Sequence, residues 1–147
     1  MQDVNIYIET SIHGPARKDG AYLYVLECFR DGIPVTREGR GERKAATENQ
    51  LALAALDEAL GRLNCACELR IHTDCQHVLN AMDNSWVRQW QKNEWRTAKG
   101  AAVKNAELWE DILGHLDKHL YTFSGGHHGY KEWMQEQLKR EKTAHKN

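Results

Sequence analysis

The chain has 147 residues, a formal net charge of -1, 41% hydrophobic residues and 28% charged residues, which are typical values for a globular domain. No apolar run approaches the ~20 residues of a transmembrane helix, and the amino terminus lacks the charged-then-apolar pattern of a secretory signal. These features exclude a membrane-spanning protein and lead us to expect a cytoplasmic monomer. We expect one domain over residues 1–142 and a polar tail over residues 143–147.

The first part of the chain has the pattern of a small sheet. Residues 4–9 alternate between apolar and polar side chains, which predicts a half-buried strand that ends on the carboxylate of Glu9. Residues 21–29 and a segment beginning at Ile33 are predicted as two further strands, joined by a tight turn at Asp31-Gly32. We therefore expect an antiparallel meander of three strands.

The period then changes to that of a helix. Thr47 and Gln50 have the spacing of a capping box, and an amphipathic helix is expected to continue to about Arg62. A further strand then alternates up to Asp74. A strand, a helix and a second strand imply parallel pairing through a right-handed crossover. If the two strands are neighbours, Glu9 and Asp74 meet at one end of the sheet, where a divalent cation or a shared proton would neutralise them.

The stretch after Asp74 is both aromatic and cationic. A short helical pattern over residues 77–82 precedes a basic helix that begins at Trp86. One interpretation is a surface for nucleic acid, because ammonium and guanidinium groups displace counterions from phosphates while aromatic rings supply apolar contact area. The other is an amphipathic helix with its tryptophans in the core. The candidate nucleic-acid-binding residues here are Trp86, Arg88, Trp90, Lys92, Trp95, Arg96, Lys99 and Lys104.

The last third of the chain predicts a helix over residues 106–116 and a short strand over residues 120–123. Glycines then surround His127 and His128 in a loop. A final helix is expected from Tyr130 to about Lys142, with Met134 and Leu138 facing inward.

This order of elements resembles type 1 ribonuclease H over nearly the whole chain. Residues 6–11 (Ile-Tyr-Ile-Glu-Thr-Ser) are similar to the first-strand motif of the family, and Thr73-Asp74-Cys75 is similar to its Thr-Asp-Ser motif. Residues 86–99 and 103–109 resemble the basic protrusion of some members, and residues 126–129 resemble the Gly-His-x-Gly loop. The resemblance implies an α/β fold with a five-stranded mixed sheet, three antiparallel strands plus parallel strands, flanked by helices.

The resemblance also implies cleavage of the RNA strand of an RNA/DNA hybrid by Mg²⁺ or Mn²⁺ ions held by acidic side chains. It assigns Glu9, where Asp is usual, and Asp74 as catalytic metal ligands. The fourth acid falls on Gln137 by simple counting, or on Glu136 if the preceding loop is one residue shorter, and we favour Glu136. His127 matches the loop histidine that assists proton transfer or product release.

The helix motif departs most from the family. The pattern Thr-Asn-Asn-Arg-x-Glu-Leu reads Thr-Glu-Asn-Gln-Leu-Ala-Leu over residues 47–53, so Ala52 stands in place of the catalytic glutamate. Glu48 lies one turn before Ala52 and is a candidate substitute; alternatively it is an acid of the first turn, favoured by the helix dipole. Asn49 and Gln50 match positions that contact the hybrid, whose minor groove displays ribose hydroxyls.

Three hypotheses about function follow. The first is a ribonuclease H-like protein that binds RNA/DNA hybrid or other duplex nucleic acid and cleaves it weakly or not at all. The second is an active metal-dependent ribonuclease H with a rearranged carboxylate cluster in which Glu48 substitutes. The third is a protein-interaction scaffold without enzymatic activity. We favour the first.

Overall fold

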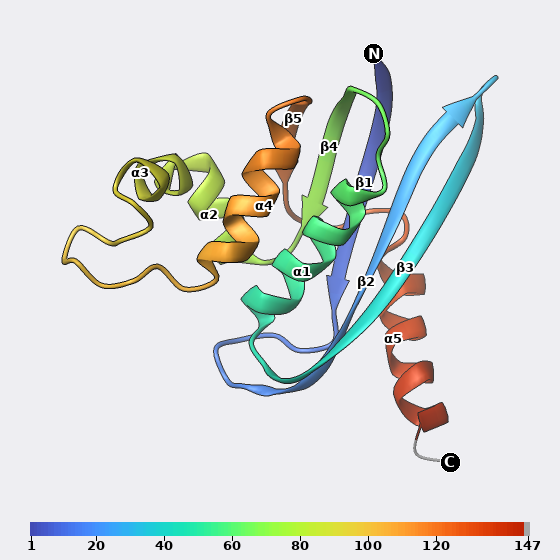
Figure 1. Cartoon of the computed structure of the whole chain (residues 1–147). Helices are drawn as coiled ribbons and strands as arrows, with labels where there is room; N and C mark the ends of the chain where they lie inside the picture. Colours follow the sequence, from blue (N-terminus) through green and yellow to red (C-terminus); the bar gives the residue numbers. More distant parts are fainter. Residues whose placement is uncertain (146–147) are drawn as a thin grey trace.

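A single mixed sheet organises the chain. The computed structural model describes the backbone of residues 1–145 and the side chains of residues 1–140, so residues 146–147 of the predicted tail lie outside the described residues. The sheet order is β3-β2-β1-β4-β5 (Figure 1). Strands β1 to β3 are antiparallel, whereas β4 pairs with β1, and β5 with β4, in parallel. The predicted sheet is confirmed. The strands are β1 (Gln2–Thr10), β2 (Lys18–Arg30), β3 (Ile33–Ala46), β4 (Cys67–Thr73) and β5 (Leu120–Ser124).

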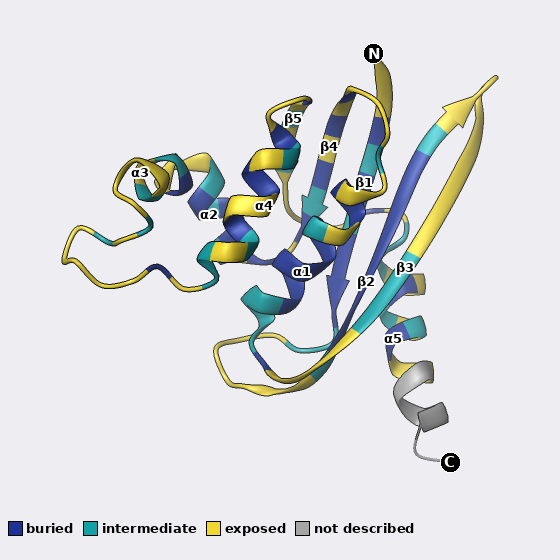
Figure 2. Ribbon diagram, viewed as in Figure 1, coloured by how far each residue is buried: buried dark blue, intermediate teal, exposed yellow. Residues whose placement is uncertain are grey.

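Helices cover both faces of the sheet, and the alternating side chains of β2 take part in both cores. Its Tyr22, Tyr24 and Leu26 belong to the main core with residues of α1 and α4, whereas Leu23 packs with Met134 of α5. Figure 2 shows these buried stripes along the elements. Among the described residues, no helix has the length and apolar content needed to cross a membrane. The helices are α1 (Glu48–Gly61), α2 (Gln76–Asp83), α3 (Trp86–Lys92), α4 (Ala106–Leu116) and α5 (Lys131–His145).

The amino terminus of α1 has the predicted capping box. The backbone N–H of Gln50 donates to Oγ1 of Thr47 at 3.1 Å, and Oε1 of Gln50 accepts from the backbone N–H of Thr47 at 3.1 Å. These bonds satisfy two donors at the start of the helix. They also occupy the side-chain oxygen of Gln50, which was predicted to contact nucleic acid.

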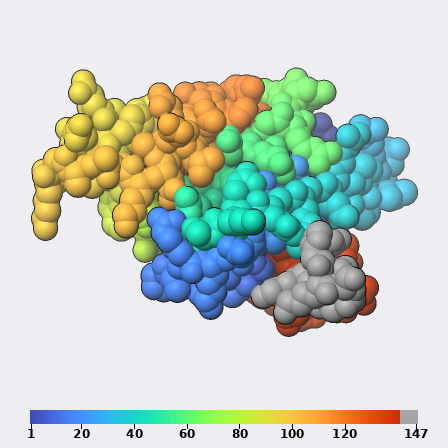
Figure 3. All heavy atoms as spheres, turned by 60° about the horizontal axis from the view of Figure 1, so that its bottom comes forward, coloured from blue at the N-terminus to red at the C-terminus, as the bar shows by residue number. Residues whose placement is uncertain are grey.

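The basic segment is a short helix followed by a loop, and not one continuous helix as predicted. Helix α3 ends at Lys92, and Glu94 and Trp95 have φ angles of 56° and 61°. Such left-handed residues interrupt the helical hydrogen bonds. The chain then continues to residue 105 as a protruding loop. This loop forms one end of the molecule (yellow in Figure 3).

The tryptophans of this segment divide between core and surface. Trp90 and Trp95 are partly buried and pack against the main core, whereas Trp86 is 38% exposed. The core interpretation therefore holds for Trp90 and Trp95, while the cationic side chains around them remain at the surface.

Helix α5 begins one residue after the predicted start and continues to His145, beyond the predicted end at Lys142. The predicted inward residues are confirmed, because Met134 and Leu138 are buried against Ala21, Leu23 and Val25 of β2. This packing places the first turns of α5 beside the carboxyl end of β1.

Candidate functional site

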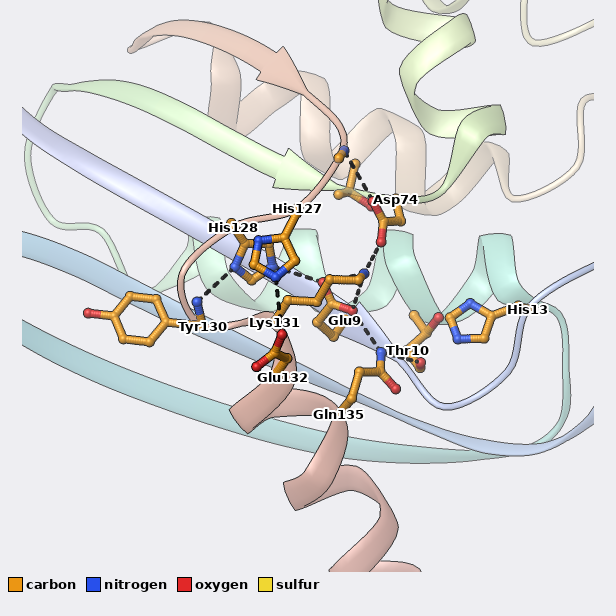
Figure 4. Close-up of polar contacts among 12 residues, drawn as sticks. Glu9, Thr10, His13, Asp74, His127, His128, Tyr130, Lys131, Glu132 and Gln135 are labelled. Carbon is orange, nitrogen blue, oxygen red and sulfur yellow. Dashed lines mark hydrogen bonds and ion pairs between the residues drawn. The ribbon is translucent and has the colours of Figure 1, made fainter.

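The register of β1 and β4 brings Glu9 and Asp74 to the same edge of the sheet. Ile8 is the parallel partner of Thr73, and Glu9 and Asp74 are the residues that follow these two along the chain. Glu9 is only 3% exposed, whereas the side chain of Asp74 is 34% exposed. The predicted strand pairing is confirmed, and the two carboxylates share one neighbour, Lys131 of α5 (Figure 4).

Side-chain donors surround the buried carboxylate of Glu9. Its Oε1 accepts from Nε2 of Gln135 at 2.7 Å and from Nζ of Lys131 at 3.1 Å, and its Oε2 contacts Nε2 of His128 at 2.9 Å. Burial alone raises the pKa of Glu9, but the hydrogen bonds from His128, Gln135 and Lys131 outweigh it and lower the pKa below its ordinary value. Glu9 is therefore an ionised carboxylate whose oxygens accept hydrogen bonds from His128, Lys131 and Gln135.

The ammonium of Lys131 lies between the two acids. Besides Glu9, it donates to Oδ2 of Asp74. Burial lowers the pKa of Lys131, but the hydrogen bonds to Asp74 and Glu9 outweigh that effect, so its pKa is raised and the side chain stays protonated. The other oxygen of Asp74 accepts from the backbone N–H of Gly126 at 3.2 Å, and Gly126 has a φ of 92°, where a glycine is favoured.

The tautomer of His128 follows from its two contacts. Its Nδ1 accepts from the backbone N–H of Tyr130 at 3.2 Å, so the ring proton lies on Nε2, which donates to Glu9. The ring also lies 4.7 Å from that of Tyr7. His128 is thus a fixed donor to Glu9 on the face of the sheet that α5 covers.

A second buried carboxylate anchors the start of α5. Glu27 is 6% exposed and accepts from Asn5 at 2.9 Å, from Tyr7 at 3.3 Å and from the hydroxyl of Tyr130. Burial and the charge of Glu27 raise the pKa of Tyr7 to about 12, and the hydrogen bond to Glu27, followed by burial, raises that of Tyr130 to about 12. The neutral phenol of Tyr130 therefore ties the residue before Lys131 to Glu27 of β2.

The helix acid predicted as a substitute contacts a different part of the chain. Oε1 of Glu48 accepts from the backbone N–H of Gly14 at 3.0 Å, and Oε2 lies 3.9 Å from Nδ1 of His13. Glu48 thus holds the loop between β1 and β2. Ala52 is 2% exposed and belongs to the main core.

Glu136 and His127 also have partners outside the pair formed by Glu9 and Asp74. The carboxylate of Glu136 pairs with Arg140 at 2.9 Å, and both side chains are more than half exposed. Nε2 of His127 lies 3.5 Å from Glu132 on the outer side of α5. The structure therefore joins Glu9 and Asp74 through Lys131, whereas Glu48, Glu136 and His127 form their hydrogen bonds and ion pairs with other residues.

The predicted metal ligands do not form a cluster. Across the part of the chain that the structure describes, no group of three or more His, Cys, Asp or Glu side chains has the arrangement of a metal site. Mg²⁺ and Mn²⁺ require several oxygen ligands. The position between Glu9 and Asp74 is instead taken by the ammonium of Lys131.

Three residues of this site were missed in the sequence: His128, Lys131 and Gln135. Lys131 and Gln135 are four residues apart, so they share a face of α5, and that face lies beside the row formed by Met134 and Leu138. This spacing was visible in the sequence. It became informative only once the inward face of α5 and its packing on β1 were known.

The cationic residues among the nucleic-acid-binding candidates differ in whether their side chains already have a partner inside the protein. Arg88 is paired with Asp117 at 2.9 Å, and Arg96 donates to the backbone carbonyl of Gly100 at 3.0 Å. By contrast, within residues 1–140 no acidic side chain forms an ion pair with the exposed residues Lys92, Lys99 or Lys104.

On α1, the two amides have contacts inside the protein. Oδ1 of Asn49 is 3.1 Å from Sγ of Cys75, which donates to it. Oε1 of Gln50 also accepts from Arg17 at 3.3 Å. The family motif has an arginine at the position of Gln50. In this chain, Arg17 supplies a guanidinium beside Gln50.

Comparisons with known proteins agree with this fold and its motifs. A ribonuclease H from Nitratidesulfovibrio vulgaris is 33% identical over 132 residues, which cover 88% of this chain and 81% of that protein. The crystal structure of LC9-RNase H1, a type 1 RNase H with the type 2 active-site motif, aligns with a TM-score of 0.74 and 22% identity over 95% of this chain and 69% of that one.

A foamy viral protease-reverse transcriptase, solved in complex with RNA/DNA hybrid, aligns with a TM-score of 0.65 and 12% identity over 93% of this chain and 19% of that one. The profile of the RNase H family matches residues 1–141. The chain therefore belongs to the RNase H family.

Proposed function

We propose that this protein binds RNA/DNA hybrid or a related nucleic-acid duplex and hydrolyses it weakly or not at all. The observation that carries the proposal is the ammonium of Lys131 bonded to both Glu9 and Asp74. RNase H relatives generally use divalent metal ions, but here Ala52 stands at the position of the helix acid, and the α5 residues that reach Glu9 are Lys131 and Gln135, neither of which is an acid. These side chains do not fit a metal centre.

The protruding segment supports the binding half of the proposal. Lys92, Lys99 and Lys104 are exposed on α3 and the loop that follows it. Trp90 of α3 and Trp95 of the loop pack against the core, so the cationic groups of this segment are presented on an anchored backbone. Unpaired ammonium groups of this kind neutralise phosphates and release their counterions.

The competing function is an active ribonuclease H. The identity to proteins named ribonuclease H favours it. The contacts of Glu48 do not, because its carboxylate is bound to Gly14 and lies beside His13, both in the loop between β1 and β2.

Two assays on the purified protein separate these functions. Fluorescence anisotropy with a labelled RNA/DNA hybrid, and with DNA and RNA duplexes of the same sequence, should show salt-dependent binding. A gel assay with a labelled RNA strand should show little or no cleavage in Mg²⁺ or Mn²⁺. Robust cleavage that Asp74→Asn abolishes would establish the active enzyme, and failure to bind any duplex would refute the proposal.

A further inference from the structure

The contacts of Lys131 point to a role beyond that of an ordinary surface lysine. Its Nζ lies 3.1 Å and 3.4 Å from the two oxygens of Glu9 and also donates to Asp74. Its side chain is 26% exposed, whereas that of Glu9 is 2% exposed. A cation that bridges two carboxylates at the end of neighbouring strands has the position and charge sign of a bound metal ion.

Other donors also bind the two acids. Gln135 and His128 donate to Glu9, and the backbone N–H of Gly126 donates to Asp74. A divalent ion would have to displace the ammonium and share the two carboxylates with these donors. It would also find only a single net negative charge at the site, because the ammonium already neutralises one of the two carboxylates.

We infer that Lys131 is a resident counter-ion that excludes divalent metal ions from the Glu9 and Asp74 pair, so that this protein binds its duplex without a divalent metal. The exclusion of metal ions by Lys131 concerns the protein alone. Duplex binding without a divalent metal rests on the proposed function. The experiment therefore has one arm without nucleic acid and one arm with it.

The first arm uses Mn²⁺ alone as the probe. Electron paramagnetic resonance measures free Mn²⁺, and paramagnetic broadening of the Gly126 amide in NMR spectra reports an ion beside Asp74. The wild type should show neither binding nor broadening at this site. Lys131→Met removes the charge while keeping most of the apolar stem, and it should strengthen Mn²⁺ binding at least about tenfold, equivalent to about 1.4 kcal/mol.

Two control variants separate the bridging ammonium from a general effect of charge. Lys131→Arg keeps the positive charge and should behave as the wild type. Lys118→Met makes the same change of net charge in the exposed turn between α4 and β5 and should leave Mn²⁺ binding unchanged. Circular dichroism shows whether each variant is folded. If Lys131→Met does not fold, the wild-type spectrum still decides, because broadening of Gly126 there would overturn the inference.

The second arm measures the affinity of the wild type for RNA/DNA hybrid in EDTA and in MgCl₂ at matched ionic strength. Binding in MgCl₂ should be no tighter than in EDTA, since Mg²⁺ then acts only as a counterion that competes for the phosphates. A requirement for Mg²⁺ would refute metal-independent binding. Absence of hybrid binding in both buffers would refute the proposed function and leave the Mn²⁺ result intact, whereas Mn²⁺ binding by the wild type as tight as by Lys131→Met would refute the counter-ion.

Discussion

The double substitution of Lys92 and Lys99 by alanine gives the most direct test of the nucleic-acid surface. Both side chains are exposed, and within residues 1–140 neither forms an ion pair with an acid. Lys92 lies in the last turn of α3 and Lys99 lies in the loop that follows. If both contact phosphates, their removal should weaken binding to all duplexes and reduce its dependence on salt.

The expected magnitude follows from counterion release. Each phosphate contact contributes about 0.9 to the slope of log K against log salt, so the double variant should lose about 1.8 from the slope. At 0.1 M salt, the same relation gives a loss of about 8-fold for each contact and about 60-fold for both. Arg88→Ala should change the slope less, because the Arg88 guanidinium is already paired with Asp117 at 2.9 Å.

The assay is a salt titration of hybrid binding by fluorescence anisotropy. A matched control changes Arg30 and Arg37 to alanine, because these exposed residues lie toward the tip of the β2 and β3 hairpin, at the end of the molecule opposite α3 in Figure 1. This control should leave the slope unchanged. An unchanged slope for Lys92→Ala and Lys99→Ala together would show that the protruding segment does not hold the duplex.

Three further predictions concern stability and the acidic side chains. Tyr130→Phe should lower the free energy of unfolding by about 1.5 kcal/mol and Tm by about 3–6 °C in thermal denaturation, because it removes a hydrogen bond to the charged Glu27; an unchanged Tm would argue against this anchor. Because the pKa of Glu9 is lowered in the folded protein, Glu9 stabilises the fold at pH values above its ordinary pKa of 4.5, and this stability is lost as the pH falls through the folded pKa. Glu9→Gln should therefore make the free energy of unfolding less dependent on pH in the acidic range. A pH dependence as steep as that of the wild type would contradict this. Glu48→Ala should leave any residual RNA cleavage unchanged in the gel assay, and loss of cleavage would support Glu48 as the substitute acid.

The sheet was predictable because its signals are local and agree with one another. Alternation up to Glu9 and up to Asp74, with a capped helix between them, requires parallel pairing and brings the two acids together. The end of the basic helix was not predictable from its period. Glu94 and Trp95 adopt left-handed backbone conformations that few non-glycine residues adopt, and no residue type in the segment indicates this.

The α5 residues of the site were harder to predict, because their identity depends on how many residues separate His127 from the start of the helix. Counting from His127 selects Gln137, and shortening by one residue selects Glu136, but the α5 residues that reach Glu9 are Lys131 and Gln135. Helix α5 begins directly after Tyr130, whose bond to Glu27 sets where the first turn lies. A glutamate within the apolar β2 segment was the signal that such an anchor exists, since a buried carboxylate requires donors.

The departures from the family pattern make physical sense together. A pair of carboxylates at one end of a sheet needs a cation, and Lys131 supplies one. With that cation in place, a third or fourth acid would no longer be needed for a metal, and Ala52 and Gln135 carry no charge. The longer side chain of Glu9 also has a use, because its carboxylate meets donors from α5 and from the loop before it. These contacts support our proposal that Lys131, rather than a metal ion, neutralises Glu9 and Asp74 and joins the sheet to α5.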